Sequence, residues 1–234
     1  SAVGSPEIIF DWSTQRCEVE DTPDAPARAF RDSTGRVNLF ATHVQNYRMT
    51  GPSLNSVTRD CNRIMASSLD PVLANANHSE WLVAPYTLDG QTVHSLIHAE
   101  WYPHLVDNRC LQYQEGTITA LTLAVSTDRG ATYTSPADYK VWQSPVAWDT
   151  SFACTSSYGG WNPSNIVRMG NHYYSLFLVP NDPVGYITTG GPFLMRTADL
   201  SSGSAWEIWT GTGWDSSLGA RGAKINTMGV PESL

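Results

Sequence analysis

The 234-residue sequence predicts an all-β protein built from many short strands. Its 18 glycines and 14 prolines are spread along the chain, and no apolar heptad pattern is longer than two helical turns. Aromatic residues make up 11% of the chain, and these side chains suit the half-buried surface of a pleated sheet. Hydrophobic residues make up 41% and charged residues 15%, which excludes a disordered chain. We expect a single domain over residues 1–234.

Three stretches of the chain share one pattern. They cover about residues 24–75, 78–145 and 158–214. Each has a strand pair around a turn, followed by a further strand that ends in Ser or Thr near an Asp. The expected strand pairs and further strands are 28–41 with 64–70, 81–97 with 121–128, and 165–177 with 193–199.

The turns and the repeat length favour a β-propeller. Asp89-Gly90 and Gly170-Asn171 are hairpin turns of the kind that needs positive φ. Each repeat takes roughly 60–70 residues, enough for a four-stranded blade with its loops. Propellers close with four or more blades, so three repeats leave the ring open. Pro6–Phe10 is a candidate strand of another blade, while residues 215–234 have little strand character. We therefore expect an incomplete propeller and a sequence that is part of a longer chain.

One turn carries a further sign of this fold. The segment from Ser126 to Tyr133 reads S-T-D-R-G-A-T-Y and resembles the Asp box of sialidases and other propeller proteins, S-x-D-x-G-x-T-W. In that motif the Asp side chain and the Gly close a tight turn between the two outer strands, and the aromatic ring tucks underneath. The motif is structural and specifies no reaction. A β-sandwich with an unrelated hairpin of this kind is the alternative.

The net charge and the cysteines limit the binding partners and the cellular compartment to be expected for the protein. The net charge of −8 lacks the basic footprint of a nucleic-acid binder, and no run of 18 apolar residues predicts a membrane span. The four cysteines form no CxxC pair, which argues against a zinc site. They suit a secreted or periplasmic protein with up to two disulfides, in any of three pairings; four buried thiols are the alternative. No cofactor is indicated, and a structural or channel Ca²⁺ stays open.

The sharpest local signal for chemistry is the segment from His98 to His104. On a strand, His98, Glu100 and Tyr102 share one face because side chains alternate. A His and a Glu at the end of an apolar strand are costly to bury without a partner or a task. Glu100 beside Trp101 is a candidate general acid. A structural His–Glu pair explains the pattern equally well, and the spacing of His98 and His104 alone does not predict a metal site.

Polar residues also stand ahead of the inner strands expected in the other two repeats. In the first repeat, Asp24 and Arg28 precede the inner strand, and a buried Arg needs an anionic partner. The loop with His43 and Arg48 has the polar and aromatic character of a carbohydrate contact. The alternatives are that Asp24 is only a turn residue and that the loop with His43 and Arg48 is an ordinary solvated loop.

The third repeat opens with Trp161 and Asn162. An amide binds sugar hydroxyls, and a Trp or Tyr ring stacks on a sugar face. A glycine-rich turn with a buried Trp is the alternative. The substrate-binding candidates of the whole chain are Arg28, His43, Arg48, His98, Trp101, His104, Trp161 and Asn162.

Together these features resemble the secreted five-bladed propeller glycosidases, including their arabinan- and galactan-cleaving members. The resemblance rests on Asp24, Arg28, His98, Glu100, the stretch 162–165 and the hairpin 196–206. It implies a five-bladed type of propeller and a glycoside hydrolase that acts on a polysaccharide or oligosaccharide by carboxylate acid/base catalysis.

In such an enzyme Asp24 is the base or nucleophile and Glu100 the proton donor, while Arg28, His43 and His98 hold the substrate and the acids. Asn162 stands where that family usually places a further acid. Two alternatives remain open. A sialidase-like exo-glycosidase needs several arginines on one carboxylate, with Arg28, Arg48 and Arg196 as candidates. A non-catalytic glycan-binding propeller relies instead on Trp101, Tyr158 and Trp161.

Overall fold

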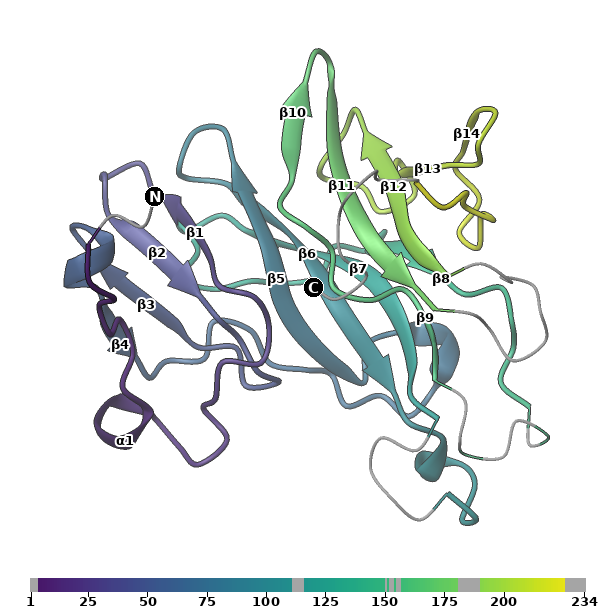
Figure 1. The fold of residues 1–234 in the computed structure, drawn as a ribbon, viewed down its shortest axis with the longest axis horizontal. Helices are drawn as coiled ribbons and strands as arrows, with labels where there is room; N and C mark the ends of the chain where they lie inside the picture. Colours follow the sequence, from purple (N-terminus) through teal and green to yellow (C-terminus); the bar gives the residue numbers. More distant parts are fainter. Residues whose placement is uncertain are drawn as a thin grey trace.

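The computed structural model describes residues 4–110, 116–149, 151, 154, 157–180 and 190–225. Within them the chain forms fourteen strands in three sheets, with antiparallel pairing throughout except for one short parallel contact (Figure 1). The helices within these residues are short: α1 (Trp12–Gln15) and the single-turn 3₁₀ helices η1 (Leu54–Ser56), η2 (Leu73–Asn75) and η3 (Pro103–Leu105), with Ser151 also in 3₁₀ conformation. The expected all-β class is confirmed, and the described residues do not form a closed propeller.

The three sheets follow one another along the chain. The first sheet contains β1 (Arg28–Arg31), β2 (Val37–Phe40), β3 (Arg48–Gly51) and β4 (Thr58–Asp60), in that order. The second contains β5 (Ser79–Thr87), β6 (Val93–Trp101), β7 (Ile118–Ser126) and β8 (Lys140–Gln143), with β9 (Tyr158–Gly159) parallel to β7. The third contains β10 (Val167–Met169), β11 (His172–Val179), β12 (Gly191–Thr197), β13 (Glu207–Trp209) and β14 (Trp214–Asp215).

Apolar side chains between neighbouring sheets form the core. Phe40 of the first sheet packs with Leu82 and Ile97 of the second, and the other face of the second sheet places Leu121 against Phe177 of the third. The second sheet is therefore buried on both faces, which matches its nearly continuous apolar strands. Figure 1 shows the second sheet between the other two.

Two predicted strands are wrong. Residues 64–70 form no strand, because Ile64 and Met65 cross the core between the first two sheets as a buried loop. The Ile64 backbone bonds to Asn46 and Tyr133 instead of to a ladder. Pro6–Phe10 also forms no strand: Ile9 and Phe10 pack on the outer face of the first sheet. A short apolar run reads the same in sequence whether it pairs as a strand or covers one.

The turn after β7 has the geometry expected for its sequence. The Ser126 hydroxyl donates to Asp128 Oδ1 over 2.7 Å, and the Gly130 and Thr132 N–H groups donate to Ser126 Oγ and Asp128 Oδ1 over 2.8 Å each. Tyr133 is buried beneath the turn. The kinship of this turn with the Asp box stays a prediction.

All four cysteines form disulfides. Cys17 pairs with Cys61, and Cys110 pairs with Cys154. The two expected disulfides are present, and the structure selects one of the three pairings that the sequence left open.

Candidate functional site

A buried carboxylate held by two neighbours lies at the end of β6. His98 Nε2 is 3.0 Å from Glu100 Oε1, and the Tyr102 hydroxyl donates to Glu100 Oε2 over 2.7 Å. The side chains of His98 and Glu100 are only 6% and 11% exposed. Both oxygens of Glu100 are therefore held in fixed positions. Strand alternation places His98 and Glu100 on one face, as the sequence indicated.

Aromatic rings from two other elements enclose His98. Trp81 lies directly across from His98 in the register of β5 and β6, and the two ring centroids are 5.6 Å apart. Trp161 contacts the His98 ring at 5.3 Å from the segment that leads into the third sheet, where its backbone pairs with Leu178. His43, from the loop after β2, meets the edge of Trp81 at 6.0 Å. The cluster therefore combines His43 from a loop of the first sheet, Trp81 and His98 from strands of the second sheet, and Trp161 from the segment that leads into the third sheet.

Two further histidines flank Tyr102. The Tyr102 ring stacks on His104 at 5.7 Å and meets the His78 ring edge-on at 5.5 Å. Burial, with a smaller effect from the nearby His104, lowers the pKa of His78, so that its imidazole is neutral at neutral pH. Four of the six histidines in the chain thus gather around one glutamate.

Several ring nitrogens of this cluster are buried without a hydrogen-bond partner among the described residues. They are His43 Nδ1, Trp81 Nε1, His98 Nδ1, His104 Nδ1 and Trp161 Nε1. The Glu100 carboxylate selects the His98 tautomer with its proton on Nε2, which leaves Nδ1 as an acceptor. The indole nitrogens are donors only. A ligand that satisfies this set must both donate and accept, as hydroxyl groups do.

Asp24 and Arg28 form no hydrogen bond or ion pair with Glu100 among the described residues. Asp24 is exposed, but Ala25 next to it packs against Trp81. Arg28 is partly buried, and this burial lowers the pKa of its guanidinium. Its Nη1 donates to the Ala27 carbonyl over 3.1 Å, and no carboxylate among the described residues is within ion-pair distance. The anionic partner expected for Arg28 is thus not found in this part of the chain.

The three arginines of the sialidase alternative lie in two sheets: Arg28 and Arg48 are on either side of Phe40 in the first sheet, and Arg196 is in the third. Arg48 lies in β3, where it faces Asp60 at 3.5 Å and donates to Asn38 over 3.0 Å. Arg196 lies in β12 and forms an ion pair with Glu207 at 2.9 Å. Arg48 and Arg196 thus each have a carboxylate neighbour within their own sheet.

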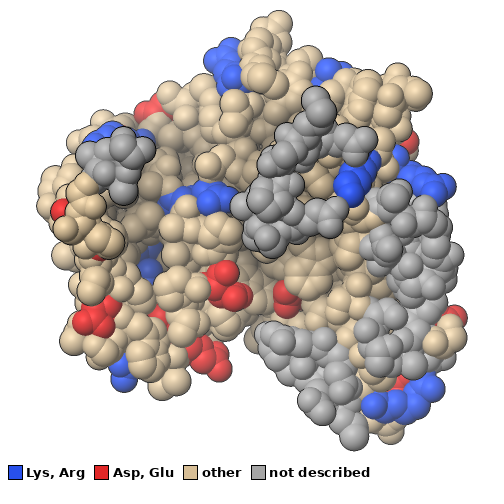
Figure 2. Space-filling view, viewed as in Figure 1, with Lys and Arg blue, Asp and Glu red and all other residues tan. Residues whose placement is uncertain are grey.

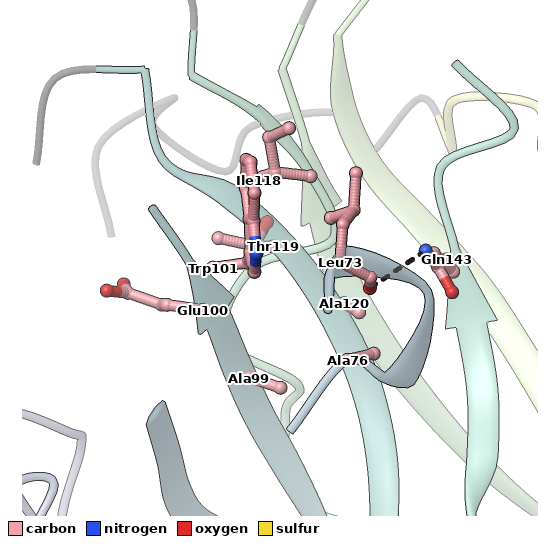
Figure 3. A pocket seen from close by; sticks show the side chains of 9 residues that line it. All are labelled: Leu73, Ala76, Ala99, Glu100, Trp101, Ile118, Thr119, Ala120 and Gln143. Carbon is pink, nitrogen blue, oxygen red and sulfur yellow. Dashed lines mark hydrogen bonds between the residues drawn. The ribbon is translucent and has the colours of Figure 1, made fainter. Parts of the chain in front are cut away.

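Two other candidates have different surroundings from those expected. Trp101 is 3% exposed and donates from Nε1 to the Pro71 carbonyl over 2.7 Å. It lines a small apolar crevice with Leu73 and Ile118, and Figure 3 shows the Glu100 carboxylate pointing away from that crevice. Trp101 is therefore a core residue. Asn162 is exposed and has a φ of 40°, a left-handed conformation that Asn tolerates better than most residues.

Sequence reasoning missed a second buried glutamate. Glu80 is 2% exposed and lies on the face of β5 opposite Trp81. Its Oε2 accepts from the Ser68 N–H over 3.2 Å, while Oε1 has no partner among the described residues. Burial raises the pKa of Glu80 to about 7. The signal in the sequence was a single acid inside the apolar run 79–84.

Charged side chains are dispersed on the face of the molecule that Figure 2 shows. Figure 2 shows acidic and basic side chains in small separate groups on one face, with uncharged residues between them. In the described part of the chain, no three His, Cys, Asp or Glu side chains are grouped as metal ligands. No helix in that part is both long enough and apolar enough to cross a membrane.

Comparisons with known proteins give little further guidance. No family model matches the sequence, and no curated protein matches it. Among solved structures, a GH43 β-1,3-galactosidase matches with a TM-score of 0.34 and 10% identity, over 81% of this chain and 45% of that chain. The chain thus spans less than half the length of that enzyme. A likeness this weak carries no argument about activity.

Proposed function

We propose that this protein is an extracellular carbohydrate-active protein whose saccharide binds at the cluster of Trp81, His98, Glu100 and Trp161. The observation that carries the proposal is the set of buried, unpartnered ring nitrogens around His98. Each such group costs about 1–3 kcal/mol when left unsatisfied. Closely spaced sugar hydroxyls supply both donors and acceptors, and the partly exposed Trp161 ring offers apolar contact to the C–H groups of a sugar. The two disulfides support an extracellular setting.

The reaction we propose at this site is hydrolysis of a glycosidic bond. In this proposed reaction Glu100 starts as the carboxylic acid and gives its proton to the glycosidic oxygen as the bond from that oxygen to the anomeric carbon breaks, which returns Glu100 to the carboxylate. In the inverting form, Asp24 takes a proton from the water that forms the new bond to the anomeric carbon. In the retaining form, Asp24 attacks that carbon first, and water then releases the sugar. His98 and Tyr102 hold the two oxygens of Glu100.

A screen of p-nitrophenyl glycosides and polysaccharides tests this function. We expect the wild type to release reducing sugar from one substrate class. Glu100→Gln keeps the shape of the side chain but removes the transferable proton, so we expect hydrolysis to fall by about 10²–10⁴-fold with binding retained. Glu20→Gln, at an exposed glutamate of the N-terminal segment, is the matched control and should keep full activity. If the wild type binds no saccharide, the whole proposal fails.

A non-catalytic glycan-binding role is the second candidate. It is favoured by the position of Asp24, whose side chain is exposed and makes no hydrogen bond to the cluster in the described residues. In that case the wild type binds a saccharide, measured by calorimetry, without cleaving it. Trp161→Ala then weakens binding, while Glu100→Gln leaves it intact. Loss of cleavage in Asp24→Asn as well as in Glu100→Gln decides for the hydrolase.

A further inference from the structure

A hollow lies between the second and third sheets, toward the opposite end of β6 from Glu100. Its volume is about 270 Å³, and its walls come from the β5–β6 hairpin, from β11 and from the turn after β12. The lining residues that matter for the argument are Leu88, Asp89, His94, Tyr173, Asp199 and Leu200. His94 and Glu100 are six residues apart on β6, a span of roughly 20 Å. The hollow is therefore separate from the cluster around Glu100.

Each of the two turns contributes one aspartate to the hollow. Asp89 Oδ1 accepts from the N–H groups of Gln91 and Thr92 over 2.8 Å each. Asp199 Oδ1 accepts from the N–H and the hydroxyl of Ser201 over 2.8 Å and 2.6 Å. These bonds lower the pKa of both carboxyl groups, so both are ionised at neutral pH. In the described part of the chain, Oδ2 of each carboxylate accepts no hydrogen bond from another residue.

The histidine in the wall of the hollow does not neutralise these charges. Burial lowers the pKa of His94, and a bond to the Leu200 carbonyl and the charges of the two aspartates offset only part of this effect. The His94 imidazole is therefore neutral at neutral pH. Arg168 lies 5.8 Å from the centre of the Tyr173 ring but is not among the residues that line the hollow. The lining residues thus carry two negative charges and no positive one.

A buried tyrosine gives a second, independent sign of a ligand. Tyr173 is 9% exposed and points from β11 toward the second sheet, where its ring meets that of Tyr86 at 5.3 Å. Its hydroxyl forms no hydrogen bond in the part of the chain that the structure describes, although the residue lines the hollow. A buried hydroxyl normally has a hydrogen-bond partner. The hollow therefore offers a ligand this hydroxyl in addition to the two carboxylate oxygens.

The donors and acceptors of this set favour one kind of cation. A metal ion needs more protein ligands, and no three His, Cys, Asp or Glu side chains are grouped as metal ligands among the described residues. A guanidinium prefers both oxygens of one carboxylate, whereas each aspartate here has one oxygen engaged in its own turn. An ammonium is compact and donates three separate hydrogen bonds.

We propose that this hollow binds a primary ammonium group carried on an apolar stem or ring, as in an alkylamine or an amino sugar. The ammonium pairs with Oδ2 of Asp89 and of Asp199, and the Tyr173 hydroxyl accepts its remaining N–H. Leu88 and Leu200 border the hollow and contact the carbon atoms of the ligand. The site does not depend on saccharide binding at Glu100, so the two can fail separately.

An NMR titration of the whole chain, read from the backbone amides of residues 88–92 and 198–201, tests the site. We expect n-butylammonium or D-glucosamine to bind saturably at neutral pH, while the uncharged analogues n-butanol and D-glucose do not. The amine that binds more tightly shows whether a stem or a ring is preferred. Asp89→Asn and Asp199→Asn keep an acceptor for the turn but remove the charge, and each should raise the dissociation constant about threefold to tenfold. Asp149→Asn is the matched control, because Asp149 holds a turn of its own through the Ser151 N–H over 2.7 Å and does not line the hollow.

Three results overturn this site. One is a wild type to which neither amine binds saturably, or to which the uncharged analogues bind as tightly. Another is binding that shifts amides elsewhere and leaves both turns unchanged. The third is a dissociation constant that is the same in Asp89→Asn and Asp199→Asn as in Asp149→Asn. The amide spectrum of each variant without ligand shows that lost binding is not a lost fold.

Discussion

The first and third sheets each have an outer face rich in apolar residues, but only the first is closed by its own chain. On the first sheet, Val37 and Met49 lie beneath Ile9 and Phe10, and Met49 is 2% exposed. On the third sheet, Met169 is 57% exposed. The same residue type in the same kind of strand is thus core in one place and surface in the other, because Ile9 and Phe10 cover the first face and no described residue covers Met169 in the same way.

The N-terminal cover is fixed by more than its apolar contacts. The Cys17–Cys61 disulfide ties it to the segment after β4. Arg59 of β4 pairs with Asp21 through two of its nitrogens and lies 4.9 Å from the Phe10 ring. The covalent bond and the ion pair therefore hold this segment in place in addition to the apolar contacts of Ile9 and Phe10. The third sheet has no comparable fastening among the described residues.

Removing the ion pair should have the largest effect on stability. The side chains of Arg59 and Asp21 are 7% and 2% exposed, so Arg59→Ala leaves a buried carboxylate without its partner. We expect a loss of about 3–5 kcal/mol in the free energy of unfolding, measured with urea. Arg63→Ala is the control, because Arg63 is 49% exposed and faces Glu18 at 3.6 Å; it should cost less than about 1 kcal/mol. Equal losses in the two variants would show that Asp21 does not depend on Arg59.

Truncating Met49 tests whether the cover makes a true core. Met49→Ala removes buried apolar atoms between the first sheet and the cover, and we expect it to destabilise the protein by roughly 2–5 kcal/mol in the same urea measurement. Leu54→Ala, at a residue 48% exposed on η1, is the control and should change little. A loss below about 1 kcal/mol for Met49→Ala would mean that residues 9 and 10 leave this face easily.

The sequence allowed part of this architecture to be predicted, for local reasons. The alternation around Asp89-Gly90 predicted the long β5–β6 hairpin, because register and turn chemistry act over a few residues. The spacing of His98 and Glu100 likewise placed them on one face, where they contact each other. Such features depend on residues close together in the sequence, so turn residues and the alternation of side chains along a strand are enough to predict them.

The features that failed depend on distant contacts. Ile64 looks like a strand residue but crosses the core as a loop, since its backbone partners come from residues 46 and 133. Trp81 was not recognised as part of the site, because its contact with His98 follows from strand register and its contact with His43 from a loop. Trp101 was expected at a sugar and lies in the core, because one step along a strand reverses the face.

A comparison of two equally buried acidic residues predicts how the stability of the protein depends on pH. Asp21 and Glu80 are each 2% exposed, but only Asp21 has a cationic partner. Burial raises the pKa of Glu80 from its ordinary 4.5 to about 7. Between these values the folded state keeps a proton on Glu80 that the unfolded state loses, so the stability that Glu80 contributes is greatest below pH 4.5 and is lost as pH rises toward 7.

We expect Glu80→Gln to remove this fall. Its free energy of unfolding, relative to wild type, should rise by up to about 3 kcal/mol between pH 4.5 and pH 7, because the amide never ionises. Urea unfolding of both proteins across this window measures the difference, in which the other titrating groups cancel. Glu20→Gln, at an exposed position, should run parallel to wild type. A constant difference between Glu80→Gln and wild type would show that Glu80 does not titrate in this range.

The smallest expected effect is the one that separates the two faces most directly. Met169→Ala removes the same atoms as Met49→Ala, but from a side chain that is already 57% exposed. We expect the free energy of unfolding to change by no more than about 0.5 kcal/mol. Tryptophan fluorescence in urea measures this change. A loss as large as that of Met49→Ala would mean that the monomer covers this face with its own chain, and the contrast between the first and third sheets would no longer hold.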